Sequence, residues 1–159
     1  MRELYSSPFF IIRVDDARRI VTRARTERGF ATLQEVEAEY AIMLRAFDQV
    51  SRARYGLLVD TRLAPPRNDP EFERLVGRLY PRLHSGFRNL AVLVKTQAGK
   101  LQITRLFEAN GIKTAIFLDE NAALAHLGIE HASGERLRPG VVPPAASSEP
   151  TRRISRRGA

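Results

Sequence analysis

The polar segment Asp60-Thr61-Arg62 is the part of the sequence best placed to bind another molecule. It directly follows the apolar run 55–59, and ligands of open α/β sheets bind at the carboxyl ends of the strands. Two interpretations stay open. In the first, Asp60 accepts hydrogen bonds from the loop backbone, and Arg62 pairs with Asp60 or Asp69. In the second, the charged loop faces a partner through six candidate residues, which are Asp60, Thr61, Arg62, Arg67, Asn68 and Asp69.

No group of residues has the spacing of a known catalytic or metal-binding motif. Residues 96–100, followed by Leu101, lack the first glycine and the last hydroxyl residue of a phosphate-binding loop, so we predict a plain strand-to-helix turn. His84, His126 and His131 have no metal-ligand spacing beside carboxylates, and the chain has no cysteine. We place His84 in a polar loop. The sequence therefore predicts no catalytic residue, no metal and no cofactor, and a protein that is not an enzyme.

The arginines near the carboxyl terminus are a second candidate binding feature. Lys and Arg total 26 against 18 Asp and Glu, a formal net charge of +8. From residue 135 onward there are six Arg and two Glu, a net of +4, so half of the excess lies in this tail. Near an anionic leaflet each arginine contributes about 1 kcal/mol, and the candidates are Arg152, Arg153, Arg156 and Arg157. Specific nucleic-acid recognition is not expected, because the chain has no base-reading motif.

Length and composition favour one globular domain. The chain has 159 residues, of which 43% are hydrophobic and 28% charged, and a chain of this size buries a single core. Its longest apolar runs are far shorter than the roughly 20 residues of a membrane span. Residues 1–7 contain no apolar stretch typical of a signal peptide. We therefore expect a cytoplasmic location.

The first half of the sequence predicts a hairpin followed by a helix. The β-rich segments 9–14 and 20–24 flank a polar turn, which is typical of an antiparallel hairpin. Thr32 is followed three residues later by Glu35, the pattern of a capping box at a helix start. Apolar residues then recur at spacings of three and four as far as Val50, which predicts an amphipathic helix of that length.

The second half predicts three further strands, each followed by a helix. The apolar runs are 55–60, 90–94 and 115–118, and such runs are typical of strands buried on both faces. Helix starts are indicated by Asp69 with Pro70, by residues 96–99 and by Asp119. Pro81 is expected to end or kink the helix that contains it.

Together these elements predict an α/β fold with a mixed sheet of about five strands and about four helices. An antiparallel hairpin opens the sheet, and parallel β-α repeats complete it. We assign residues 1–133 to this domain. Residues 134–159 are rich in Pro, Ala and Arg, contain few apolar residues, and are predicted to be a disordered basic tail.

The order of elements, together with residues 55–73, resembles the STAS-like fold of anti-sigma-factor antagonists. More closely, it is similar to small bacterial SpoIIAA-like proteins of the STAS/SEC14 type. The matching features are a central strand that ends in Asp60, a loop, and an acidic residue that opens the next helix; the runs 91–96 and 115–124 also fit. The resemblance covers residues 8–130. It implies a STAS-like domain that works by binding a regulatory or kinase-type protein.

One departure from this family concerns regulation. Antagonists of the phosphoswitch type carry a phosphorylated Ser at the start of the helix after this loop, whereas here the segment reads Asn68-Asp69-Pro70-Glu71. Glu71 already places a negative charge there. We therefore expect a non-enzymatic regulatory or scaffolding module without the phosphoswitch.

Three alternatives remain beside this expectation. The tail could bind an anionic membrane or nucleic acid. An apolar ligand or lipid could bind between helix and sheet, as in SEC14-type relatives, which would need a cavity beneath residues 72–83. Homo-oligomerisation is also left open.

Overall fold

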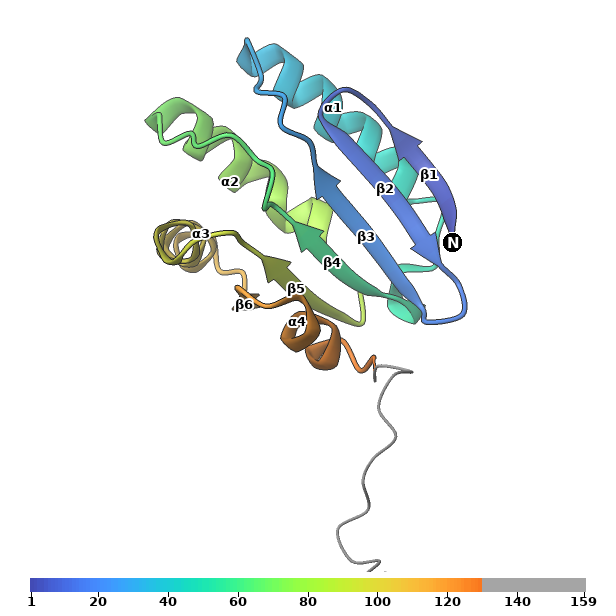
Figure 1. The fold of residues 1–159 in the computed structure, drawn as a ribbon. Coiled ribbons are helices and arrows are strands. Elements are labelled where there is room, and N and C mark those ends of the chain that lie inside the picture. The colour runs from blue at the N-terminus through green and yellow to red at the C-terminus, as the bar shows by residue number, and fades with distance from the viewer. Residues whose placement is uncertain (130–159) are drawn as a thin grey trace, which may run out of the picture.

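A six-stranded mixed sheet forms the centre of the protein in a computed structural model, which describes residues 1–129 (Figure 1). The strands lie in chain order, with β1, β2 and β3 antiparallel and β3 to β6 parallel. Their bounds are β1 Arg2–Ser6, β2 Phe10–Asp15, β3 Ile20–Arg25, β4 Gly56–Asp60, β5 Asn89–Leu93 and β6 Ala115–Phe117. The predicted tail, residues 134–159 with its four candidate arginines, lies outside the described residues.

Four α-helices accompany the sheet, and each begins at a side-chain cap. They are α1 Leu33–Phe47, α2 Pro70–His84, α3 Gln97–Ala109 and α4 Glu120–His126; a short 3-10 turn spans Arg52–Arg54. Their starts are capped by Thr32, Asp69, Thr96 and Asp119, each of which accepts a hydrogen bond from the backbone N–H three residues later. The predicted α/β class with a mixed sheet and four helices is therefore confirmed.

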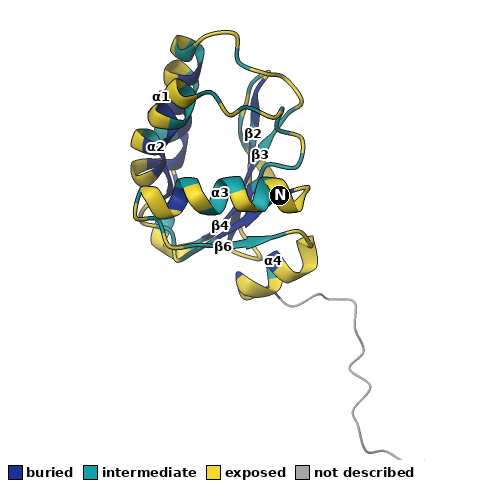
Figure 2. Ribbon diagram, turned by 90° about the vertical axis from the view of Figure 1, so that its left-hand side faces the viewer, coloured by how far each residue is buried: buried dark blue, intermediate teal, exposed yellow. Residues whose placement is uncertain are grey.

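The two faces of the sheet are covered unequally. Helices α1, α2 and α3 pack on one face and enclose the larger core, in which Phe10, Val36, Met43 and Phe47 have no exposed surface. Helix α4 lies on the other face and covers a smaller cluster that includes Leu58 and Leu127. Figure 2 shows buried residues along the sheet, with exposed ones on the outer sides of the helices.

The sheet has one strand more than the sequence predicted. Strand β1 pairs with β2 at the edge, and its register shifts between Glu3 and Tyr5. Because such an irregularity breaks the alternation of inward and outward side chains, the neighbouring residues Leu4 and Tyr5 both pack against the larger core. The expected period of two is therefore absent from this short segment.

Two helix ends also differ from the prediction. Helix α1 ends at Phe47, although Val50 is still buried, because a turn after Asp48 carries it into the core. Helix α2 continues through Pro81 to His84, so of the two effects expected of Pro81 the helix end is wrong. Proline removes one helical hydrogen bond, but the last turn is retained because Leu83 and His84 are buried.

Candidate functional site

The carboxyl edge of the parallel strands carries an ion-pair network around Arg62. The guanidinium of Arg62 donates to both carboxylate oxygens of Asp60, at 3.0 and 2.7 Å, and it lies 3.0 Å from a carboxylate oxygen of Glu120 at the start of α4. The Arg62 backbone N–H also donates to Asp60, at 3.0 Å. The hydrogen bonds with Asp60 are the main cause of a raised pKa of Arg62. This network ties the end of β4 to α4.

The loop after β4 is hydrogen-bonded to its neighbours at both ends. The Thr61 backbone N–H and hydroxyl both donate to the carbonyl of Leu93 at the end of β5, each at 2.9 Å. Further along, the Gln102 side chain of α3 donates to the carbonyl of Arg67 at 2.8 Å. Hydrogen bonds to β5 and α3 thus hold both ends of the loop.

The Arg67 side chain stabilises the end of this loop through hydrogen bonds and a ring contact. It donates to both carboxylate oxygens of Asp69, at 2.6 and 3.3 Å, and to the carbonyl of Phe30 at 3.2 Å, while its guanidinium stacks on the ring of Phe72. Asp69 also caps α2 through the N–H of Phe72. Hydrogen bonding to Arg67 is the main cause of the lowered pKa of Asp69.

The structure therefore brings five of the six predicted residues into one bonded loop. Asp60 accepts the loop N–H and pairs with Arg62, as the first interpretation predicted. Asn68 is the exception, since it is exposed and belongs to neither ion pair. Contact with a partner stays a prediction for all six.

Three exposed apolar side chains lie in segments that follow the parallel strands. Of the five large apolar side chains that are exposed in residues 1–129, Leu63 follows β4, Leu101 lies near the start of α3, and Leu118 follows β6. Leu63 is 53% exposed although the loop on both sides of it is fixed. Sequence reasoning missed Leu63, because it selected only polar residues from this loop.

A second group of residues that sequence reasoning missed lies beneath α1 and α2. Arg23 of β3 is 1% exposed, and its guanidinium carbon lies 5.2 Å from the ring centre of Phe10 and 5.7 Å from those of Tyr40 and Tyr80. The alternation of inward and outward side chains along β3 could have indicated that Arg23 points into the core. Val21 packs in the larger core, so Arg23 two residues later points to the same side.

His84 lies near this group and not in the polar loop where it was predicted. It is 6% exposed, and its ring packs against those of Tyr80 and Phe107, at 5.0 and 5.8 Å between centres. Burial, followed by the charges of Arg23 and Arg52, holds the pKa of His84 well below its usual value. The imidazole is therefore neutral at physiological pH.

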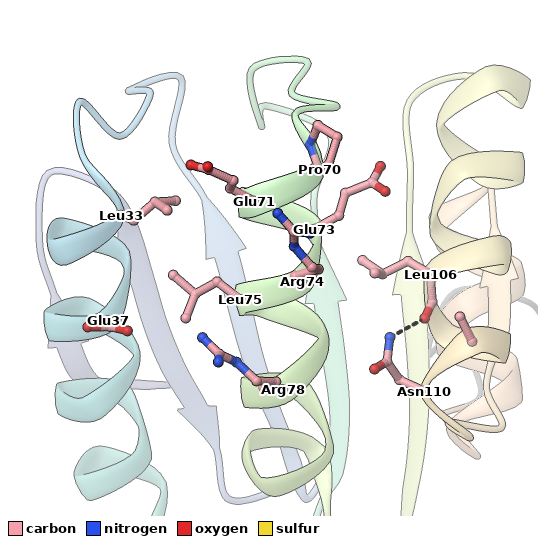
Figure 3. A pocket seen from close by; sticks show the side chains of 11 residues that line it. Leu33, Glu37, Pro70, Glu71, Glu73, Arg74, Leu75, Arg78, Leu106 and Asn110 are labelled. Carbon is pink, nitrogen blue, oxygen red and sulfur yellow. Dashed lines mark hydrogen bonds between the residues drawn. The ribbon is translucent and has the colours of Figure 1, made fainter.

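A groove also runs along the outer side of α2, between α1 and α3 (Figure 3). Its lining includes Leu33 and Glu37 from α1, Arg74 and Arg78 from α2, and Leu106 from α3 together with Asn110, the residue that follows α3. Beneath α2, by contrast, Leu75, Val76, Tyr80 and Leu83 pack in the larger core. Core side chains thus occupy the region where the alternative of an apolar ligand needs a cavity.

Two further properties concern residues 1–129 only. No three His, Asp or Glu side chains of this part lie together as a metal site requires. None of its helices has both the length and the apolar character needed to cross a membrane. Comparison of the chain with protein-family models, curated proteins and solved structures found no match.

Proposed function

We propose that this protein is a non-enzymatic module of the STAS-like type that binds another protein through the surface after β4. The contact surface consists of Arg62, Leu63 and the neighbouring residues up to Asp69. The observation that carries the proposal is Leu63, an apolar side chain that is 53% exposed on a loop otherwise fixed by hydrogen bonds.

A fixed loop with an exposed apolar residue has the properties of a protein contact. Ordering a mobile loop costs free energy on binding, so a loop that is already ordered binds more tightly for the same contacts. Interfaces bury an apolar centre within a polar rim. Here Leu63 is the apolar centre, and the ion pairs of Arg62 and Arg67 on either side supply the rim.

The same geometry supports binding without a phosphoswitch. Thr61 is the one hydroxyl residue between positions 60 and 75, and its hydroxyl donates to the Leu93 carbonyl at 2.9 Å. A phosphate on Thr61 would remove that donor and place a double negative charge next to Asp60. We therefore expect incubation with a kinase to leave this segment unmodified; phosphate on Thr61 that changes binding would contradict this part of the proposal.

Site-specific crosslinking tests the contact. A photoreactive amino acid replaces Leu63 in the full chain, and the protein is irradiated in native lysate. The matched control carries the same group at Ile42, an exposed apolar position on α1 away from this edge. We expect one adduct of defined mass from position 63 that is absent from position 42.

Competition with unlabelled protein makes the test specific. Wild-type protein should suppress the adduct, and Leu63→Asp protein should suppress it at least about tenfold less well, as expected for loss of an apolar contact at the centre of an interface. Arg62→Glu and Arg67→Glu proteins should also compete poorly while they remain folded. Equal labelling from positions 42 and 63, or equal competition by wild type and Leu63→Asp, would refute the proposal.

A further inference from the structure

Arg23 and Arg25 are two neighbouring positive charges on the core side of β3. Arg23 is 1% exposed, and its Nε and Nη1 atoms have no hydrogen-bond partner. Arg25 is half-buried, and an N–H of its Nη2 donates to the Arg28 carbonyl at 2.9 Å. Its buried Nη1 also lacks a hydrogen-bond partner. Both residues thus have unpartnered guanidinium nitrogens, and both guanidinium groups lie near the ring of Phe10.

Aromatic rings surround both guanidinium groups but do not neutralise them. Arg25 lies 4.8 Å from the ring centre of Phe10 and 4.7 Å from that of Phe30, while Arg23 lies over Phe10, Tyr40 and Tyr80. Ring faces attract cations, yet they accept no conventional hydrogen bond from the free N–H groups. Burial keeps the pKa of Tyr40 well above its usual value, so this phenol stays neutral.

Carboxylates of the described residues do not fill this role either. No ion pair within 4.0 Å joins Arg23 or Arg25 to an acidic residue between positions 1 and 129. Glu39 of α1 influences Arg25 electrostatically, but its carboxylate accepts hydrogen bonds from Tyr5 and Ser7 at 2.7 and 3.0 Å. Two like charges therefore share an enclosed region without a bonded counter-charge.

We propose that Arg23 and Arg25 together bind one oxyanion, the carboxylate or phosphate group of a small ligand. An oxyanion supplies both missing properties, because it accepts hydrogen bonds from several N–H groups at once and neutralises charge, whereas a water molecule supplies only the former. Arginine is suited to this role because its planar fork matches carboxylate and phosphate oxygens. The site is separate from the proposed partner surface around Leu63.

A further basic side chain lies beside Arg25. The backbone carbonyl of Arg28 accepts a hydrogen bond from Arg25, and the exposed side chain of Arg28 stacks on Phe9. Basic side chains around an opening attract anions and raise their local concentration. Arg23 is enclosed whereas Arg25 is half-buried, so Arg25 is the more accessible of the two.

Titration with inorganic phosphate tests the proposal on the full chain at constant ionic strength. Saturating phosphate should raise the melting temperature of the wild-type protein by about 5 °C. Arg23→Met and Arg25→Met should bind phosphate about 10- to 100-fold more weakly, as expected for loss of a charged hydrogen-bond donor. The matched control is Arg13→Met, which removes an exposed positive charge from the neighbouring strand β2 and should respond like wild type.

A parallel titration with acetate identifies the preferred group. A larger rise with acetate assigns a carboxylate ligand, a larger rise with phosphate assigns a phosphate ligand, and either result supports the proposal. Equal rises in wild type and Arg23→Met, or no rise in wild type with either anion, would overturn it.

NMR of the wild-type protein provides a test that does not depend on the variants folding. Phosphate should shift the Nε–H signals of Arg23 and Arg25, and leave that of Arg105 unchanged, since Arg105 is 70% exposed and pairs with Glu73. Signals of Arg23 and Arg25 that do not move at saturating phosphate and acetate would overturn the proposal.

Discussion

Arginine side chains are held in opposite ways beneath the helices and at the carboxyl edge of the sheet. At the edge, Arg62 and Arg67 each bind a carboxylate through two nitrogens, at 2.6 to 3.3 Å. Beneath α1 and α2, Arg23 and Arg25 lie against aromatic rings and keep unpartnered nitrogens. The paired guanidinium groups are part-exposed, whereas Arg23 is almost completely enclosed.

The two regions therefore contribute differently to the stability and the shape of the protein. Exposed ion pairs change the free energy of unfolding by little, because solvent screens them, but they fix the conformation of a loop. A buried charge costs several kcal/mol of desolvation unless a partner compensates it. The edge arginines therefore shape a surface, and the buried arginines require a compensating group.

The largest effect is expected at Phe10, which has no exposed surface and whose ring centre lies 5.2 Å from the guanidinium carbon of Arg23 and 4.8 Å from that of Arg25. Phe10→Ala should lower the free energy of unfolding by about 3–5 kcal/mol, as measured by urea denaturation, because it removes a buried ring from the core. Phe10→Leu separates the contribution of the ring face from that of apolar burial. It should cost about 1 kcal/mol more than Phe107→Leu in the same core; equal costs would show that the ring–guanidinium contacts contribute no stability.

The next effect concerns pH, through the buried His84. Because its pKa is lowered in the folded state, the unfolded chain binds more protons below about pH 6.5. Stability is therefore fully present above that pH and falls as the pH decreases towards the folded pKa, by up to about 1.4 kcal/mol per pH unit.

Urea denaturation at pH 7 and pH 5.5 measures this slope. His84→Phe should reduce it, and His126→Gln, a change at an exposed histidine, should not. The carboxylates with lowered pKa values, Asp16 and Asp69, have ordinary values of 3.8 and so act in a more acidic window. An unchanged slope in His84→Phe would contradict a neutral, enclosed imidazole next to Arg23.

A smaller effect is expected at Arg67, the more enclosed of the two edge arginines. Arg67→Lys keeps the charge but loses the fork on Asp69 and the stacking on Phe72. It should cost about 1 kcal/mol in urea denaturation, because lysine cannot reproduce planar, bidentate contacts. Arg105→Lys, at a pair whose arginine is 70% exposed, is the control and should be close to neutral. Equal costs would show that enclosure makes no difference at this edge.

Local chemistry explains what could be predicted from the sequence. The caps Thr32, Asp69 and Asp119 act on N–H groups three residues away, so their positions follow from neighbouring residues alone. The predicted capping box is only half formed. The Thr32 hydroxyl accepts from the N–H of Glu35, but the Glu35 carboxylate accepts from the N–H of Ala31, at 2.7 Å, and not from that of Thr32. The pairing of Arg62 with Asp60 is similarly local, because the two lie two residues apart.

The features that escaped prediction depend on contacts between distant segments. Arg23 is enclosed by rings from β2, α1 and α2. Residues 20–25 alone do not indicate that aromatic rings from these elements pack around it. His84 is buried because α2 continues past Pro81 and brings it against Phe107 of α3. In both cases the packing of separate elements determines burial, which the residue type alone does not indicate.

The smallest effect is expected for the pair of Arg62 and Glu120, and it is the sharpest test of the contrast. Their side chains are 39% and 49% exposed at a separation of 3.0 Å, so solvent screens most of their attraction. A double-mutant cycle with Arg62→Met and Glu120→Gln should give a coupling of about 0.5 kcal/mol. In 1 M salt this coupling should vanish, because the screening length falls to about 3 Å. A salt-resistant coupling above about 2 kcal/mol would mean that this ion pair is effectively buried, and the two regions would then hold their arginines in the same kind of environment.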